Sequence, residues 1–314
     1  MSSWLKGFFS KAKQEDNAVL GMSLTPDSAA CCIVRWEGDQ PRIVEQFTLS
    51  QSFQSPLEAL ESLLSNHSLP ALPLFITLGY EYYSLLLVDA PEVPASELKE
   101  AVGWKVKDLI SQPLEDVIVD AFLLPDDAYR GRMKMTYVAV VDKKNIAAMV
   151  KACEKQNCCL LGIGINELSM AALTTLSTQP GRGTAVLYLN EKGGTINLIE
   201  NDCLYLSRSI ELELGRDTEI SSEDSFDKVD SLALDIQRSL DYYESQIGKA
   251  GVSQLLLVSG SEGIHQWCDL LKERLQIPVA LASLPMGEVA DEIENIQLAG
   301  MIAPAFGAAL RRLG

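Results

Sequence analysis

"VLYLNEKGGTINLIENDCLYLSRSIELE", residues 186–213, alternates apolar runs with two short turns. The first turn contains Gly193 and Gly194, and the second is Asn201-Asp202. These residue types favour tight hairpins because they adopt positive φ angles at low cost. The stretch, which begins at about Thr184, therefore predicts three antiparallel strands joined by two hairpins.

The same order of elements occurs about 165 residues earlier in the chain. There, residues 19–24, 29–36 and 42–49 read as strands joined by a Thr-Pro-Asp-Ser turn and a Glu-Gly-Asp-Gln hairpin. Each copy continues into a βαβ unit, with helices over residues 55–66 and 229–247 and buried strands after them. Three antiparallel strands followed by a βαβ unit, twice, are the ribonuclease-H-like pattern and predict a duplicated α/β fold.

A separate segment lies between the two copies. A helix capped by Ser96, strands over 117–125 and 134–142, and a second helix over 143–157 predict a small α+β subdomain. The predicted organisation is a tail over 1–17, a first half over 18–91, an insert over 92–165 and a second half over 166–314.

The composition of the 314 residues excludes several classes of function. A net charge of −17 disfavours nucleic acid as a partner, because binding to phosphates depends on basic residues. Two histidines and seven irregularly spaced cysteines show no spacing typical of a metal site, and we expect reduced, mostly buried thiols. We expect a cytoplasmic chain, since neither a membrane span nor a signal peptide is evident.

Two long motifs resemble a known family. They are "SELKEAVGWKVKDLISQPLEDVIVDAF", residues 96–122, and "LDIQRSLDYYESQ", residues 234–246. From about Val19 onward the chain resembles the actin-like, PilM-like platform proteins of type IV pili and secretion systems. Within that family the pattern is most similar to the MshI type of MSHA pilus biogenesis. The resemblance implies a two-domain actin-like ATPase fold located at the cytoplasmic face of the inner membrane.

The resemblance also implies a partner. In the family, the cytoplasmic tail of a PilN-like inner-membrane protein docks between the first half and the insert. Aromatic side chains concentrate binding energy at interfaces, and they mark the expected docking residues. These are Tyr80, Tyr82, Tyr83 and Trp104. The alternative for Trp104 is a core position in its helix, and self-association of the chain stays open.

Two loops correspond to the phosphate loops of actin-like ATPases, which the family writes as Asp-x-Gly followed by Ser or Thr. Ser23 and Asn190 stand where an acid is needed to hold Mg²⁺, and Pro26 has no N–H to offer a phosphate. The glycines of the second loop are explained equally well by a tight hairpin. The candidate nucleotide-binding residues, with a third turn included, are Ser23, Thr25, Asn190, Gly193, Gly194, Thr195, Ser259 and Gly260.

Three functions compete. We expect a binding platform without turnover, no obligatory cofactor and no metal site. The second is an actin-like assembly ATPase that binds or hydrolyses ATP with Mg²⁺ despite the altered loops. The third is a sugar or acetate kinase, for which the chain shows neither a phosphoryl-acceptor base nor an acid-bearing phosphate loop.

The tail "SSWLKGFFSKAKQ" places aromatic residues on one helical arc and lysines beside it. This pattern is typical of a short interfacial helix on an anionic membrane. A disordered tail and a helix packed on the body are the alternatives, because so short a helix with Gly7 inside is marginal in water. The predicted membrane-surface residues are Trp4, Phe8, Phe9, Lys6, Lys11 and Lys13.

Overall fold

The computed structural model describes residues 17–67, 69, 71–94, 96–176, 182–212, 223–261, 263–286 and 292–311. The predicted membrane-surface residues all lie outside these ranges. They are Trp4, Lys6, Phe8, Phe9, Lys11 and Lys13.

The first half is built on a five-stranded sheet. Its strand order is β3-β2-β1-β4-β8, with β1 antiparallel to β2 and parallel to β4. Helix α1 (Pro56–Asn66) is capped by Ser55, whose side chain accepts a hydrogen bond from the amide of Glu58. Helix α3 (Lys143–Lys155) packs beside α1 in the same core. The strands are β1 (Ala18–Leu24), β2 (Ser28–Glu37), β3 (Gln40–Ser50), β4 (Pro73–Leu78) and β8 (Cys159–Ile165).

The second half repeats this topology. Its order is β11-β10-β9-β12-β13, again with three antiparallel strands followed by two parallel ones. The apolar face predicted over 229–247 belongs to α5 and the π-helical turn η6 that follows it. The elements are β9 (Thr184–Asn190), β10 (Gly193–Glu200), β11 (Cys203–Ile210), α5 (Glu223–Tyr242), η6 (Tyr243–Ile247), β12 (Gln254–Ser259), α6 (Ile264–Arg274) and β13 (Val279–Leu281).

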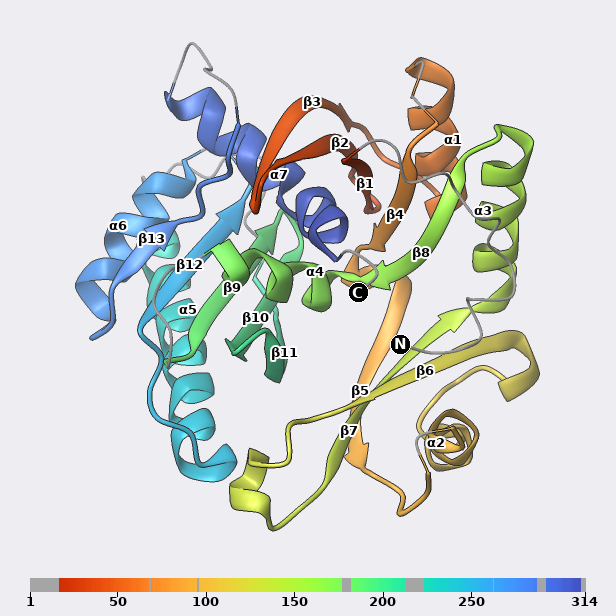
Figure 1. The fold of residues 1–314 in the computed structure, drawn as a ribbon. Coiled ribbons are helices and arrows are strands. Elements are labelled where there is room, and N and C mark those ends of the chain that lie inside the picture. Colours follow the sequence, from red (N-terminus) through yellow and green to blue (C-terminus); the bar gives the residue numbers. More distant parts are fainter. Residues whose placement is uncertain are drawn as a thin grey trace.

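The insert is a three-stranded antiparallel sheet in the order β5-β7-β6, located below the first sheet in Figure 1. Helix α2 covers it with Leu98, Val102 and Val106, which pack against valines of β6 and β7. The elements are β5 (Tyr83–Asp89), α2 (Leu98–Val106), β6 (Val117–Leu123), β7 (Met135–Asp142) and α3 (Lys143–Lys155), and the short turns are η2 (Tyr80–Tyr82), η3 (Leu114–Asp116), η4 (Ala128–Gly131) and η5 (Thr174–Leu176).

The strand pairing differs from the predicted boundaries of the insert at both ends. Strand β5, from the stretch assigned to the first half, joins the insert sheet, and β8, from the stretch assigned to the insert, extends the first sheet. Helix α3 likewise buries Met149 and Cys153 in the core of the first half. A strand belongs to the sheet whose strands pair with it. Its position along the chain does not determine that pairing.

Helix α7 (Glu292–Leu310) joins the two halves and runs between the two large sheets in Figure 1. A methyl group added at Gly21 of β1 would overlap the backbone of Ala305, and one added at Gly307 would overlap the backbone of Ser169 in α4 (Asn166–Leu173). The glycines therefore permit a close approach of backbones, and one apolar core continues from β2 through α7 into the second half.

Two further findings concern the class of protein. All seven cysteines are free and four of them are buried, as predicted. Within the described ranges, no helix combines the length and the apolar character needed to cross a membrane.

Candidate functional site

The carboxyl ends of the parallel strands meet where the two halves face each other. Leu24 pairs with Leu78 and Leu78 with Ile165 at the ends of β1, β4 and β8, and Ser259 pairs with Leu189 at the ends of β12 and β9. Ligand sites of open α/β sheets lie at this edge. Each predicted loop residue follows or ends one of these strands, so the structure brings the loops to the same edge of their sheets.

The first loop is closed by its own side chains. The Thr25 hydroxyl lies 2.6 Å from Asp27 Oδ1 and accepts a hydrogen bond of 3.0 Å from the amide of Ser28. The amide of Thr25 donates to the carbonyl of Ser28 at 2.9 Å. Since Pro26 has no N–H, and the amides of Thr25 and Ser28 donate within the turn, three of the four residues of this turn offer no backbone donor to a phosphate.

The second loop is held by Asn190 and by the first half. Asn190 Oδ1 accepts hydrogen bonds from the amide of Lys192 at 3.0 Å and from the Tyr80 hydroxyl at 3.1 Å. Its Nδ2 donates to Glu81 Oε1 at 2.8 Å. Asn190 therefore stabilises its own hairpin as an Asx turn and ties that hairpin to η2.

The glycine pair of this hairpin is required by packing. Gly193 has a φ of 142°, and a Cβ there would lie 2.5 Å from the carbonyl oxygen of Ile210 on β11. A Cβ at Gly194 would overlap the carbonyl oxygen of Tyr188 on β9. Thr195 is also buried, and its hydroxyl accepts a hydrogen bond from the side-chain Nδ2 of Asn197. The hairpin thus explains both glycines without a ligand.

The third turn is filled by α7. A methyl group at Gly300 would overlap the carbonyl of Ser259, and one at Gly260 would overlap the Met301 side chain. The Ser259 hydroxyl accepts a hydrogen bond of 3.2 Å from the amide of Ser261. Helix α7 therefore packs directly on the backbone of this turn.

Two acidic side chains, Asp27 and Glu81, lie beside the loops. Burial raises the pKa of Glu81, and the nearby carboxylate of Asp27 raises it further, whereas Lys192 acts in the opposite direction. Asp27 and Glu81 thus place two carboxyl groups beside the loops. Among the described residues there is no group of three or more His, Cys, Asp or Glu side chains arranged to hold a metal ion. Ser23 and Asn190 leave these loops without the acids that the family's loops use to hold Mg²⁺.

A cavity of about 310 Å³ opens beside the second loop. It lies between β5, an edge strand of the insert sheet, and β11, an edge strand of the second large sheet. Hydroxyl groups and one carboxylate dominate its polar lining. The lining residues are Tyr80, residues 83–86, Glu167, Thr195, Ser207 and Ser209.

Glu167 is a buried acid in this lining, with 2% of its surface exposed. The Tyr83 hydroxyl donates a hydrogen bond of 2.5 Å to its Oε2 and accepts one of 3.0 Å from the amide of Asn166. Burial raises the pKa of Glu167, and the hydrogen bond from Tyr83 partly offsets that rise. The sequence prediction missed Glu167 and Glu81, although each follows closely on the end of a parallel strand.

The four predicted docking aromatics do not share one surface. Tyr80 and Tyr83 line the cavity, whereas Tyr82 packs against the core of the first half, and its hydroxyl has no hydrogen-bond partner. Trp104 lies on the outer face of α2, is 66% exposed and does not line the cavity. The alternative that Trp104 is a core residue is wrong, because Leu98, Val102 and Val106 form the buried face of that helix.

Comparison with known proteins gives matches of structure and none of sequence. No protein-family model matches the chain, and no curated protein sequence matches it. A chain of the PilM-PilN type IV pilus biogenesis complex matches with a TM-score of 0.70 and 17% identity, over 93% of this chain and 98% of that one. A Bacteroides thetaiotaomicron protein with an actin-like ATPase fold and unknown function matches with a TM-score of 0.53 and 10% identity, over 92% of this chain and 96% of that one. The chain has an actin-like ATPase fold, and the predicted fold class is confirmed.

Proposed function

We propose that this chain is a platform protein of type IV pilus assembly. It binds the cytoplasmic tail of a PilN-like inner-membrane protein, at the cytoplasmic face of that membrane, and does not hydrolyse nucleotide. The observation that carries this proposal is the match over nearly the whole chain, insert included, to a structure determined as a complex of PilM with PilN. The motifs at 96–122 and 234–246 support the narrower proposal of an MSHA-type, MshI-like platform.

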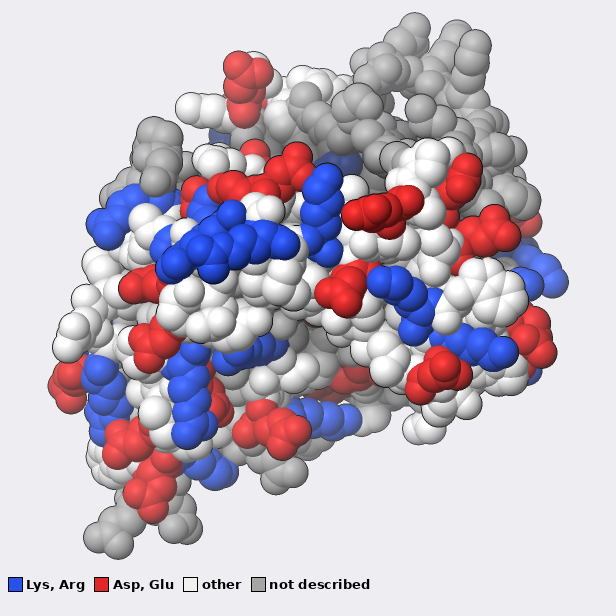
Figure 2. All heavy atoms as spheres, turned by 90° about the horizontal axis from the view of Figure 1, so that it is seen from below, with Lys and Arg blue, Asp and Glu red and all other residues white. Residues whose placement is uncertain are grey.

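The closed loops support a role in binding. Thr25 and Asn190 engage the amides of their own turns, and Asp27 and Glu81 place carboxyl groups beside them. The face seen from below, in Figure 2, intersperses acidic with basic side chains and shows no broad basic patch for a phosphate-rich partner. A scaffold that holds a protein tail needs neither an open phosphate loop nor a basic patch.

The cytoplasmic tail of the PilN-like partner has two candidate contact regions on this chain. Tyr80 and Tyr83 line the cavity together with the polar residues Ser207, Ser209 and Glu167. Trp104, with Lys107 located 5.9 Å above its ring, offers an exposed aromatic anchor on the insert. Exposed tryptophans are frequent anchors of protein interfaces.

Calorimetry of the full chain with a synthetic peptide of a PilN-like cytoplasmic tail tests this function, and titration with ATP and Mg²⁺ tests the alternative. We expect peptide binding and no heat from the nucleotide. Trp104→Ala should weaken peptide binding by at least tenfold if it is an anchor, whereas Val44→Ala, at a 45% exposed position on β3, should not. Micromolar nucleotide binding with release of phosphate would instead establish the ATPase alternative.

A further inference from the structure

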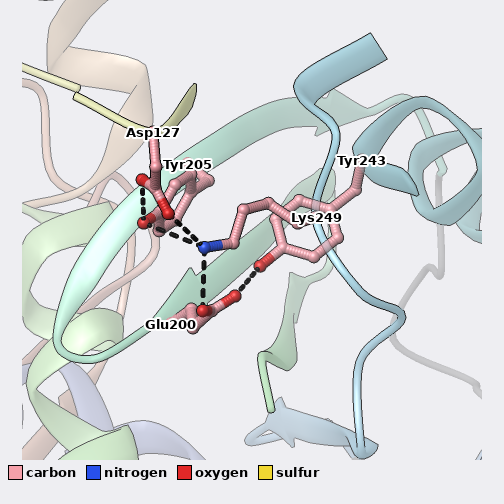
Figure 3. Close-up of polar contacts among 5 residues, drawn as sticks. All are labelled: Asp127, Glu200, Tyr205, Tyr243 and Lys249. Atoms are coloured by element: carbon pink, nitrogen blue, oxygen red, sulfur yellow. Dashed lines mark hydrogen bonds and ion pairs between the residues drawn. The ribbon is translucent and has the colours of Figure 1, made fainter. Parts of the chain in front are cut away.

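An ion cluster centred on the partly buried Lys249 joins the insert to the second half (Figure 3). Lys249 Nζ lies 2.6 Å from Asp127 Oδ2 and 2.8 Å from Glu200 Oε1, and only 11% of the lysine side chain is exposed. Asp127 belongs to the tip between β6 and β7, whereas Glu200 ends β10 and Lys249 follows η6. The cluster thus connects positions 122 residues apart.

Two tyrosines complete the hydrogen bonds of the cluster. The Tyr205 hydroxyl donates to Asp127 Oδ1 at 2.8 Å, and the Tyr243 hydroxyl donates to Glu200 Oε2 at 2.8 Å. Burial alone would lower the pKa of Lys249, but the hydrogen bonds to Asp127, Glu200 and Tyr205 raise it well above its usual value. The ammonium therefore stays charged, and both carboxylates are paired with it.

The tip that carries Asp127 is strained in its docked position. Tyr129, Arg130 and Gly131 have φ angles of 54°, 58° and 66°, a left-handed conformation that is unfavourable for the first two. Docking compensates for this strain. The Tyr129 hydroxyl lies 3.3 Å from that of Tyr242, and the Arg130 side chain packs on Gly248. Strain of this kind persists only where surrounding contacts hold it.

The cluster and the cavity lie along the same edge strand, β11. Tyr205 is in the cluster, Ser207 donates its amide hydrogen to the hydroxyl of Tyr137 at 2.8 Å, and Ser209 lines the cavity. Ser207 also lines the cavity, so only the two residues from Tyr205 to Ser207, about 7 Å of this edge, separate the cluster from the cavity. On the insert side, Leu87 pairs with Tyr137, next to the cavity-lining segment of β5.

We propose that Asp127, Glu200 and Lys249 form a releasable latch that holds the insert against the second half and controls access to the cavity. The carboxylate side chain of Asp127 is 59% exposed, so water reaches the latch directly. Opening it would loosen the insert residues Leu124, Ala128 and Tyr137 from the apolar core that they share with the second half. The latch rests on the proposed function in one respect: that function names the partner tail as the ligand that enters the cavity. The latch itself is a property of the free chain.

Hydrogen exchange of the full chain without any peptide tests the latch. Asp127→Asn removes one charge from the pair, and we expect about tenfold faster exchange in β5 and β11, with β1 unchanged. Lys249→Met should have a larger effect because it leaves Glu200 buried without a counter-charge, and the double variant should exchange no faster than Lys249→Met. The control is Asp269→Asn, which breaks an exposed pair with Lys272 on α6 and should leave β5 and β11 unaffected.

Two outcomes would overturn the latch. Faster exchange confined to residues 126–132 would show a local contact with no control of the cavity. Faster exchange in β1 as well as in β5 and β11 would show general destabilisation. Failure of a tail peptide to bind would bear on the proposed function alone, since these measurements need no peptide.

Discussion

Replacement of Gly194 by alanine tests whether the glycine pair serves the hairpin. The new Cβ would lie 2.9 Å from both the carbonyl carbon of Tyr188 and Leu189 Cδ2, and would overlap the carbonyl oxygen of Tyr188. Carbon and carbonyl oxygen atoms normally stay about 3.3 Å apart, so β9 and β10 must separate. Overpacking costs about 1 to 3 kcal/mol where side chains can move, and here a backbone must move, so we expect about 3 kcal/mol.

Thermal and denaturant unfolding measure this cost. For a chain of this length, 1 kcal/mol corresponds to about 1.5 °C, so the Tm should fall by about 4 to 5 °C, whether or not ATP is present. The matched control is Gly103→Ala in α2. No heavy atom lies within 4 Å of the point that its new Cβ would occupy, and alanine is the better helix former by about 0.5 to 1 kcal/mol. Its Tm should rise slightly.

The reasoning is refuted if Gly194→Ala melts within 1 °C of the wild type. The space between β9 and β10 would then tolerate a methyl group, and packing would no longer explain the glycine. A loss of stability that appears only when ATP is present would favour a nucleotide cradle. That result would also argue against the closed loops described above.

Glu167→Gln should gain stability relative to the wild type as the pH rises from 5 to 8. Because burial raises the pKa of Glu167, the folded state favours the protonated acid, and its contribution is lost as the pH passes through the raised value. Parallel melting curves of the two proteins would contradict this, and Tyr83→Phe shows how much of the effect needs the hydroxyl bond. Removal of residues 1–16 should abolish sedimentation with anionic vesicles and leave the Tm almost unchanged. A Tm several degrees lower would mean that the tail packs on the body.

Local pattern was enough to identify the three antiparallel strands and the first parallel strand of each large sheet, but not β8 or β13. Apolar alternation and glycine or Asn-Asp turns are set by neighbouring residues, so the hairpins at 19–49 and 184–210 could be predicted from the chain alone. The loss of acids at Ser23 and Asn190, and of an N–H at Pro26, was equally visible. These are statements about residue type, and residue type does not depend on the fold.

The partners of the loops could not be predicted in this way. Asn190 forms hydrogen bonds with Tyr80 and Glu81, which lie 110 and 109 residues earlier in the chain. No rule of local spacing predicts contacts between residues so far apart. The only clue to Glu167 in the sequence was its position shortly after a parallel strand, and that clue is weak. Its burial and its bond to Tyr83 depend on how the insert packs against α4.

The sequence by itself determined the duplicated fold, the position of the two loops and their altered chemistry, because these depend on short-range periodicity and on residue identity. Only the tertiary structure decided that β5 and β8 join the sheets they do, that α7 fills the third turn, and that Lys249 pairs with Asp127. Strand partners, close backbone approaches and buried ion pairs form between segments far apart in the chain. Their free energy depends on distances that exist only once the halves and the insert are packed together.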